Sequence, residues 1–324
     1  MKIVIAPDSF KGSLTAAEAA EAIETGFRAV YPDAEYVKVP MADGGEGTVQ
    51  SLVDATSGTI ITQLVSGPMG DMVAGFFGIL GDRQTAVIEM AAASGIHWVR
   101  PKERDVFLAS SFGTGQLINA ALDRGCDKLI VGLGGSATND GGIGMMKALG
   151  AQFFDQDGVQ LAADVRALLQ LASIDLQYLD PRLDKTEIVV ACDVDNPLCG
   201  ENGAARVFGP QKGATEEDIA VLDQALTRYG DILSANAGRD IASEPGAGAA
   251  GGMGAAFIGL IDAVLKPGVD IVIEIVDLAN SLVDANLVIT GEGRVDNQTI
   301  HGKTPTGVAK VAKSCNLPVI CIAG

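Results

Sequence analysis

The sequence predicts an α/β protein in which strands of a largely parallel sheet alternate with helices. Short apolar runs rich in Val and Ile alternate with segments of helical periodicity, starting with a β-α-β pattern at the N-terminus. With 324 residues and 48% hydrophobic residues, the chain is large enough for two moderate cores. Acid- and glycine-rich turns follow several apolar runs, which is where open parallel sheets bind their ligands.

The N-terminal part starts with strand, helix and strand, and continues with closely spaced strands. The strand at 2–6 precedes a helix at 15–30, entered by a Ser-Leu-Thr turn, and an extended run at 35–40. After a helix at 47–56, short strands are expected at 59–65, 72–80 and 85–90. No long helices separate these three strands, so the architecture is expected to change here.

The remainder of the chain returns to alternating helices and strands. Helices are expected at 114–124, 142–149, 215–235 and 305–314, and after the glycine-rich run 246–254. Strands are expected at 128–133, 187–192, 269–275, 286–290 and 318–323. Because the last run is a strand, the final βα unit is not expected to be finished.

The composition favours a cytoplasmic enzyme with a small ligand. A formal net charge of −18 argues against nucleic acid or an anionic membrane as partner, and no apolar run approaches a membrane span. The N-terminus lacks the features of a signal peptide. Five cysteines without a C-x-x-C pair predict reduced thiols, and the two histidines, His97 and His301, have no zinc spacing.

The acid- and glycine-rich turns lie at 39–48, 133–142, 191–197 and 290–296. Glycine-rich backbone that leads into a helix offers free N–H groups to an anion. Carboxylates beside that anion would repel it unless a divalent cation lay between them. The combination therefore predicts nucleotide phosphate bound together with Mg²⁺.

The turn after the strand at 128–133 has more than one interpretation. The segment 132–137 matches the dinucleotide fingerprint G-x-G-x-x-G/A, with Asp155 about twenty residues on, which would indicate an NAD-dependent dehydrogenase. The Thr-Asn-Asp that follows suits the phosphates, ribose or metal of a nucleoside triphosphate better. A plain turn with Asn139 or Asp140 as helix N-cap is the third interpretation.

The turn at 291–304 ends in Gly-Lys-Thr but is not a Walker A loop, because Asn297 stands where that motif needs glycine. Lys303 still offers a positive donor for a phosphate. Charges of both signs follow the preceding strand closely, at Glu292, Arg294 and Asp296. A solvated charged loop that leads into the next helix is the alternative.

Two further turns carry candidate chemistry. Asp8, Ser9 and Lys11 follow the first strand, where Lys11 would neutralise a transferring phosphoryl group or hold a substrate carboxylate. The alternative is a helix cap at Ser13 or Thr15 with Lys11 in solvent. Asp193 and Asp195 end the strand at 187–192. Alternate residues of a strand share a face, so both carboxylates are expected to reach one ligand.

Several motifs together resemble the signatures of class I glycerate kinases. They lie at 6–13, 41–48, 132–142, 192–198 and 290–296, in the order of that family and over nearly the whole chain. Several long motifs in order are more specific than any single glycine-rich loop. The resemblance implies ATP- and Mg²⁺-dependent phosphorylation of D-glycerate, usually at the 2-hydroxyl, in glyoxylate or sugar-diacid catabolism.

The resemblance also implies an architecture. A flavodoxin-like domain is expected from both chain ends, 1–60 with 283–324, and a second mixed α/β domain, 61–282, is expected between them. The family generally continues some tens of residues beyond a Pro-Val-Ile-Cys-Ile-Ala-Gly strand such as 318–324. The chain is therefore expected to be truncated, with an incomplete first domain.

The active site of such a kinase is expected in the cleft between the domains, where it must bring two anions together. Catalysis is assigned to Lys11, Asp193 and Arg294, and substrate binding to Asp8, Ser9, Asp43 and Asp296. Nucleotide binding is assigned to Gly134, Gly135, Ser136, Thr138, Asn139 and Lys303, and Mg²⁺ to Asp195 and Glu292. The alternatives are a kinase that gives 3-phosphoglycerate, an NAD-dependent dehydrogenase of a small hydroxy acid, and a non-catalytic nucleotide-binding module. Homo-oligomers are left open.

Overall fold

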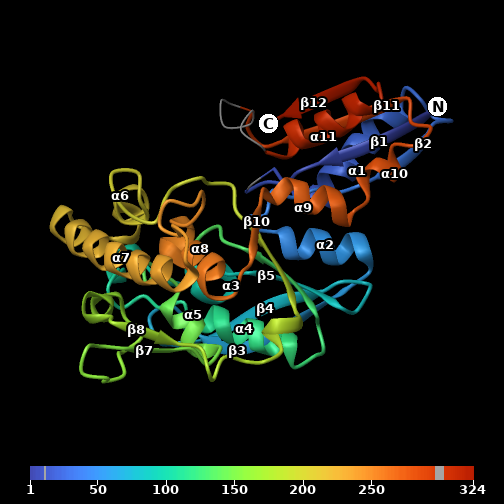
Figure 1. Ribbon diagram of the computed structural model, residues 1–324. Coiled ribbons are helices and arrows are strands. Elements are labelled where there is room, and N and C mark those ends of the chain that lie inside the picture. Colours follow the sequence, from blue (N-terminus) through green and yellow to red (C-terminus); the bar gives the residue numbers. More distant parts are fainter. Residues whose placement is uncertain (11, 296–302) are drawn as a thin grey trace. The chain divides into compact units, whose positions relative to one another are not determined.

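Figure 1 shows a computed structural model, which describes residues 1–10, 12–295 and 303–324. The chain forms two compact units, with Met1–Thr59 and Pro267–Gly324 in unit 1 and Ile60–Lys266 in unit 2. Strands and helices alternate in both units, which confirms the predicted α/β class. The sequence places the inserted domain at 61–282, whereas residues 267–282 lie in unit 1. Among the described residues, no helix has both the length and the apolar character needed to cross a membrane.

Unit 1 is built on a four-stranded parallel sheet in the order β12-β11-β1-β2. The strands are β1 (Lys2–Pro7), β2 (Glu35–Lys38), β11 (Leu287–Glu292) and β12 (Val319–Ala323). Within this sheet β1 lies between β2 and β11, the next strand of the unit along the chain, as in the flavodoxin-like order. Strands from the N-terminal and C-terminal parts of the chain thus form one sheet, in which β1 pairs with β11.

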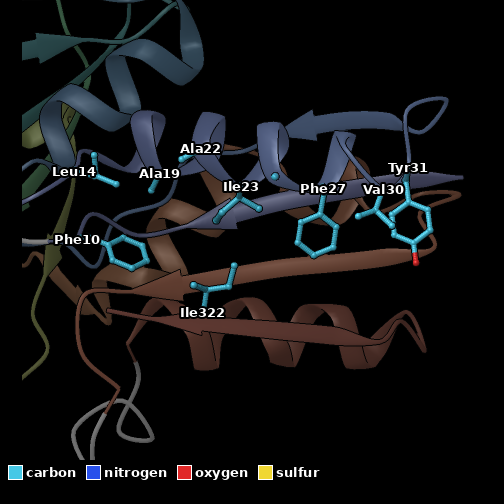
Figure 2. A pocket seen from close by; sticks show the side chains of 10 residues that line it. Phe10, Leu14, Ala19, Ala22, Ile23, Phe27, Val30, Tyr31 and Ile322 are labelled. Atoms are coloured by element: carbon cyan, nitrogen blue, oxygen red, sulfur yellow. The ribbon is translucent and has the colours of Figure 1, made fainter.

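Helices cover both faces of this sheet. Figure 2 shows α1 (Ala16–Arg28) and α11 (Thr304–Ser314) on opposite faces. Two short helices, α9 (Gly268–Ile275) and α10 (Leu278–Ser281), pack against α11. The remaining helix of the unit is α2 (Thr48–Thr56). The buried core between α1 and the sheet includes Ile3, Ile5, Ala20 and Ile289.

The start of α1 resolves the two caps considered above. Thr15 is the N-cap: its Oγ1 accepts a hydrogen bond of 3.2 Å from the N–H of Glu18, and the Glu18 carboxylate accepts one of 2.8 Å from the N–H of Thr15. This reciprocal capping box satisfies two N–H groups that a helix start otherwise leaves free.

A pocket of about 490 Å³ lies on the α1 face of unit 1 (Figure 2). Its lining is apolar and includes Phe10, Ile23, Phe27 and Ile322. On β12, Ile322 lines this pocket, whereas Ile320 is exposed. The apolar core of unit 1 is therefore open beside β12.

Unit 2 is built on a six-stranded sheet in the order β10-β9-β6-β5-β4-β3. Its strands are β3 (Thr59–Ser66), β4 (Met72–Ile79), β5 (Thr85–Glu89), β6 (Lys128–Gly132), β9 (Glu187–Ala191) and β10 (Val264–Lys266). β5, β6, β9 and β10 are parallel, whereas β4 is antiparallel to β5. β7 (Gln152–Phe154) and β8 (Ser173–Asp175) form a separate antiparallel pair.

The helices of unit 2 enclose the larger core of the protein. They are α3 (Ala91–Ser94), α4 (Phe112–Leu122), α5 (Ile143–Ala148), α6 (Ala204–Phe208), α7 (Glu216–Ala237) and α8 (Ala249–Leu260). Short 3₁₀ turns lie at η1 (Ile96–Trp98), η2 (Pro101–Glu103), η3 (Val165–Gln170), η4 (Leu183–Lys185) and η5 (Pro210–Lys212). Tyr229, Phe77, Phe153 and Phe257 are fully buried among these elements.

The prediction of a strand at 269–275 is wrong, because these residues form α9. The run Val-Asp-Ile-Val-Ile-Glu-Ile resembles a strand, since it is rich in β-branched residues. However, Gly268, Val269 and Val272 are buried, which is helical spacing, and Asp270 lies in the first turn after Pro267. The spacing of buried positions decides here against the β propensity of the residues.

Candidate functional site

Two neighbouring strands of unit 1 end in acidic residues. Pro7 at the end of β1 pairs with Gly291 of β11, and the N–H of Asp8 donates a hydrogen bond of 2.8 Å to the carbonyl of Gly291. Asp8 is 5% exposed and Glu292 is 6% exposed. The fold thus brings these two predicted site residues together at the carboxyl edge of one parallel sheet.

The carboxylate of Asp8 has defined partners. Its Oδ1 accepts a hydrogen bond of 2.6 Å from the N–H of Ser9, and its Oδ2 accepts one of 2.7 Å from Oγ1 of Thr304. Thr304 is fully buried in the first turn of α11. The loop after β1 is therefore fixed to the N-terminus of α11, where the helix dipole favours negative charge.

A positive side chain lies beside these carboxylates. Lys303, the N-cap of α11, places its Nζ 3.7 Å from Oε2 of Glu292, and 31% of its side chain is exposed. An ammonium at the start of a helix, partly open to solvent, is suited to bind an anionic group. This part of unit 1 can therefore offer both charge signs to a ligand.

The turn after β2 adds Asp43 to unit 1. The N–H of Met41 donates 2.9 Å to the carbonyl of Pro7, and Asp43 accepts a hydrogen bond of 3.0 Å from the N–H of Gly45. Gly268 lies so close to this turn that a Cβ there would be 2.1 Å from the Asp43 carbonyl oxygen. Of the other residues predicted for this part of the chain, Arg294 is exposed. Lys11 and Asp296 lie outside the described residues.

The remaining predicted site residues follow the parallel strands of unit 2. At one level of its sheet the register pairs Glu89 with Gly132, Gly132 with Ala191 and Ala191 with Lys266. The turns that carry Gly134 and Asp193 therefore start at the same edge of the sheet, which is the carboxyl edge where α/β proteins bind ligands.

Within the turn after β6, the glycines and the polar residues have different environments. Gly134 and Gly135 are exposed, and Gly135 has a φ of +74°. The polar residues assigned to the nucleotide, Ser136, Thr138 and Asn139, are buried. The backbone of Gly134 and Gly135 is thus exposed where an anion could approach it.

Asp140 anchors the buried end of this turn. Its Oδ2 accepts hydrogen bonds of 2.8 and 2.7 Å from the N–H and Oγ of Ser111, and its Oδ1 accepts one of 3.0 Å from the N–H of Gly142. Burial raises the pKa of this carboxyl group, and the hydrogen bonds from Ser111 and Gly142 oppose the increase. Asp140 thus holds the turn that precedes α5, whose N-cap is Gly142, so neither Asn139 nor Asp140 is the N-cap that the third interpretation predicted.

A buried lysine binds the same turn. Lys212 is 2% exposed, and its Nζ donates a hydrogen bond of 2.6 Å to the carbonyl oxygen of Thr138. Burial lowers the pKa of Lys212 to about 7, and the negative charge of Asp140 partly opposes this decrease. Burial raises the pKa of the Tyr229 hydroxyl, and Asp140 adds to that increase.

Asn139 is buried without a hydrogen-bond partner in the part of the chain that the structure describes. Neither Nδ2 nor Oδ1 of its amide has one, although the residue is 0% exposed. Buried polar groups in native proteins are nearly always paired with protein, water or ligand. The amide therefore retains its capacity for a ligand or an ordered water, which fits its assignment to nucleotide binding.

Asp193 and Asp195 are both exposed beyond the end of β9. The strand ends at Ala191, so the alternation of strand faces does not govern the directions of the two carboxylates. The N–H of Cys192 donates 2.9 Å to the carbonyl of Lys266, which holds the chain immediately before Asp193.

The predicted Mg²⁺ ligands do not form a ready-made cage. Asp195 belongs to unit 2 and Glu292 to unit 1. Among the described residues, no group of three or more His, Cys, Asp or Glu side chains is arranged to hold a metal ion. Carboxylate oxygen is nevertheless the donor that Mg²⁺ prefers, and Mg²⁺ commonly uses one or two carboxylates together with substrate phosphates.

The position of Asp155 does not fit the dinucleotide-binding interpretation of the 132–137 turn. That fingerprint needs an acid at the end of the next strand of the same sheet. Asp155 follows β7, which pairs with β8 in a separate sheet, and its Oδ1 accepts hydrogen bonds from the N–H groups of Asp157 and Val159. Asp155 therefore stabilises a local turn.

Some residues at these edges are not singled out by the sequence. Glu89, Thr304 and Lys212 are buried polar residues of this kind. The first two leave a signal, because Glu89 is an acid at the end of an apolar run and Thr304 belongs to Gly-Lys-Thr. Lys212 lies in Gly-Pro-Gln-Lys-Gly, which indicates a turn but not a buried ammonium.

These features define an α/β protein of the kind that binds phosphate-bearing small molecules at the carboxyl ends of its strands. A comparison with known families identifies its kind more closely. The chain belongs to the glycerate kinase family, whose model matches residues 3–324. The family expected from the motifs is thereby confirmed.

The relatives agree with this membership. A glycerate kinase of Bacillus subtilis (strain 168) is 58% identical over 324 residues, which cover 100% of this chain and 85% of the relative. The glycerate 2-kinase of Escherichia coli (strain K12) is 53% identical, with coverage of 100% and 85%. A crystal structure from Salmonella typhimurium LT2, assigned as a glycerate kinase 2, matches with a TM-score of 0.95 and 56% identity, over 100% of this chain and 87% of that one.

Proposed function

We propose that this protein is an ATP-dependent glycerate kinase that phosphorylates D-glycerate to 2-phosphoglycerate. The observation that carries the proposal is the similarity over the whole chain to proteins named glycerate kinase, at 58% and 57% identity. The position of the phosphorylated hydroxyl follows the relative from Escherichia coli that is named glycerate 2-kinase, at 53% identity.

The described residues support phosphate binding in both units. In unit 2, the exposed Gly134 and Gly135 offer backbone without side chains, and Asn139 retains an unpaired amide. In unit 1, Lys303 at the start of α11 is partly exposed. Each of these groups donates to anionic oxygen, which is what the transfer of a phosphoryl group requires.

We assign Mg²⁺ to Asp195 and Glu292, as the sequence suggests. Asp195 meets the requirement more directly, because it is exposed, whereas Glu292 is buried beside Lys303. Mg²⁺ would neutralise charge on the phosphates of ATP. Asp193 would accept the proton of the glycerate hydroxyl, while Asp8, Ser9, Asp43 and Asp296 would orient glycerate.

We further assign Lys11 and Arg294 to the phosphoryl group or the glycerate carboxylate, since cationic side chains bind anionic oxygen. The same interpretation places the enzyme in the cytoplasm, in the catabolism of glyoxylate or sugar diacids. These assignments rest on the family motifs and on the charge of each side chain.

The direct test uses the purified chain with ATP, Mg²⁺ and D-glycerate. The expected result is ADP formed only when glycerate is present, together with 2-phosphoglycerate identified by ³¹P NMR. EDTA should abolish the reaction, and added Mg²⁺ should restore it.

Each alternative has its own signature in this assay. A 3-phosphoglycerate signal would overturn the choice of hydroxyl. A nicotinamide absorbance change without ATP would indicate the dehydrogenase. Nucleotide binding without any product, measured for a folded protein, would indicate a non-catalytic module. Full activity in EDTA, with metal content verified as negligible, would overturn the role of Mg²⁺.

A further inference from the structure

The turn that joins β6 to α5 is held by several separate contacts. The N–H of Ile96 donates 2.8 Å to the carbonyl of Gly135, and the N–H of Ala137 donates 2.9 Å to that of Ser94. At the other end, Asp140 accepts from Ser111, and the N–H of Gly141 donates 2.9 Å to Gly251. The carbonyl of Thr138, between these two ends, is held by the Lys212 ammonium.

Burying the ammonium of Lys212 costs free energy that a purely structural contact would not require. Lys212 is 2% exposed, so its ammonium has lost its hydrating water, and its Nζ donates a hydrogen bond to the Thr138 carbonyl. Burying a charge costs free energy unless partners compensate, and apolar residues of similar volume often replace buried charges without loss of stability. The direction of the pKa shift of Lys212 agrees with this cost.

We propose that Lys212 is a positioning residue for the nucleotide, whose ammonium holds the Thr138 carbonyl and thereby fixes the backbone between the exposed Gly135 and the buried Asn139. This proposal rests on the proposed function, which assigns that turn to the nucleotide. Lys212 acts through the backbone of the turn and is not assigned any contact with the substrate.

The geometry explains why this one hydrogen bond matters. Thr138 lies three residues after Gly135 and directly precedes Asn139. A neutral, apolar side chain at 212 would leave the Thr138 carbonyl without its charged donor, so the turn would lose a fixed point. A displacement of about 1 Å at a binding group can cost about 10²-fold in activity.

Lys147 provides a matched control. Its Nζ also donates to a backbone carbonyl, that of Leu161, and burial also lowers its pKa. It belongs to α5 in the same unit, but its acceptor, Leu161, lies outside the 134–139 turn, 22 residues beyond Asn139 in the sequence. Lys147→Met therefore removes a comparable hydrogen bond without a change at the turn itself.

The experiment compares Lys212→Met with Lys147→Met in the full chain. Hydrogen–deuterium exchange of the segment 134–142 is measured without ligand, and steady-state kinetics give KM for ATP, KM for glycerate and kcat. For Lys212→Met we expect faster exchange in this segment and a KM for ATP raised about tenfold, with KM for glycerate within about twofold of wild type. Lys147→Met should leave all of these values near wild type.

A merely structural role would give a different pattern. It would lower the melting temperature and the active fraction while KM for ATP stayed unchanged. Wild-type exchange and an unchanged KM for ATP in Lys212→Met would overturn the proposal. If that variant does not fold, Lys212→Gln tests the proposal instead, because glutamine keeps a hydrogen-bond donor at position 212 but not the positive charge. It should show a smaller rise in KM for ATP, and an unchanged KM would overturn the proposal.

Failure of the proposed function is distinguishable from failure of this inference. If the wild-type chain makes no phosphoglycerate, the kinase assignment fails. The exchange measurement needs no activity and still tests whether Lys212 holds the turn, and ATP binding measured by calorimetry replaces KM. Equal exchange in wild type and Lys212→Met would then overturn the inference alone.

Discussion

Thr304 and Asp8 join the two ends of the chain through a buried hydrogen bond. Oγ1 of Thr304 donates to Oδ2 of Asp8 at 2.7 Å, across a separation of 296 residues in sequence. The bond connects the first turn of α11 to the loop after β1, and its acceptor is a carboxylate. Hydrogen bonds to charged groups are stronger than those between neutral groups.

Thr304→Val should therefore destabilise the protein. The valine keeps the shape of the side chain but leaves the buried Asp8 carboxylate without this donor, so the free energy of unfolding should fall by about 1.5–3 kcal/mol. Urea denaturation checks this value. Thr25→Val is the control, because Thr25 is exposed on α1 and its Oγ1 donates only to the Glu21 carbonyl of the same helix. Equal effects of both variants would contradict the importance of the Asp8 contact.

A second prediction concerns the glycines of the turn at the start of α8. Gly251 has a φ of +69°, and a Cβ there would lie 2.1 Å from the Thr138 carbonyl oxygen and 2.5 Å from the Asn139 Cα. Gly251→Ala must therefore displace either the α8 turn or the 138–139 backbone. We expect a loss of stability of about 3 kcal/mol or more, together with a raised KM for ATP.

Gly238→Ala is the control that separates the backbone strain of a positive φ from the steric clash of the added Cβ. Gly238 ends α7 with a φ of +67°, almost the same as that of Gly251, but a Cβ there would meet nothing within 4 Å. Only the left-handed conformation opposes this substitution, so its cost should be about 1 kcal/mol and KM should not change. Equal losses in the two variants would show that the contact with the 138–139 backbone is unimportant.

Much of the fold could be predicted from apolar periodicity. The strands expected at 2–6, 128–133 and 187–192 appear as β1, β6 and β9, because each is a continuous apolar run buried between helices. The strand expected at 269–275 is wrong because β-branched residues occur there on a helix. The short β7 and β8 have too few residues for a period to emerge.

The sequence predicts a place for the site, at the turns after the strands, but it does not predict the environment of each side chain in those turns. Turns after apolar runs indicate where an α/β sheet binds ligands, and the exposed Gly134 agrees with that. Whether a polar residue of the turn faces solvent depends on contacts from far along the chain. Thr138 is enclosed by Lys212 and by Gly251, which lie 74 and 113 residues away. No local pattern indicates such contacts.

The pH dependence of stability should differ between wild type and Lys212→Met. The folded-state pKa of Lys212 is about 7, below its ordinary value of 10.5. Between these values the unfolded chain binds the extra proton, so the contribution of Lys212 to folding stability becomes more favourable as pH rises from about 7 to about 10. Below pH 7 the full cost of the buried charge is present.

This prediction is checked by the difference in unfolding free energy between wild type and Lys212→Met across that pH range. The comparison cancels the contributions of other titrating groups, apart from Asp140, whose negative charge acts on the lysine. Wild type should gain stability relative to the variant as the pH rises. A constant difference between pH 7 and pH 10 would contradict a depressed pKa for Lys212.

The last prediction separates the roles of Asp193 and Asp195. Asp193 directly follows Cys192, whose N–H is bound to Lys266, so its position is set by the parallel sheet. Asp195 lies further along the exposed turn. If Asp193 is the base, Asp193→Asn should lower kcat by about 10² to 10⁴, and no Mg²⁺ concentration should restore it. If Asp195 holds Mg²⁺, Asp195→Asn should mainly raise the Mg²⁺ concentration needed for half-maximal activity.

The measurement is kcat as a function of Mg²⁺ concentration for each variant, with melting temperatures recorded in parallel. Asp157→Asn is the control, because Asp157 is an exposed aspartate of unit 2 in the turn after β7, which belongs to a separate sheet. It should behave as wild type. Near-wild-type turnover in both Asp193→Asn and Asp195→Asn would make the pair structural, and the base would then be sought among Asp43, Asp140 and Asp296. Asp140 is the weakest of these three, since its carboxylate is buried and engaged with Ser111 and Gly142.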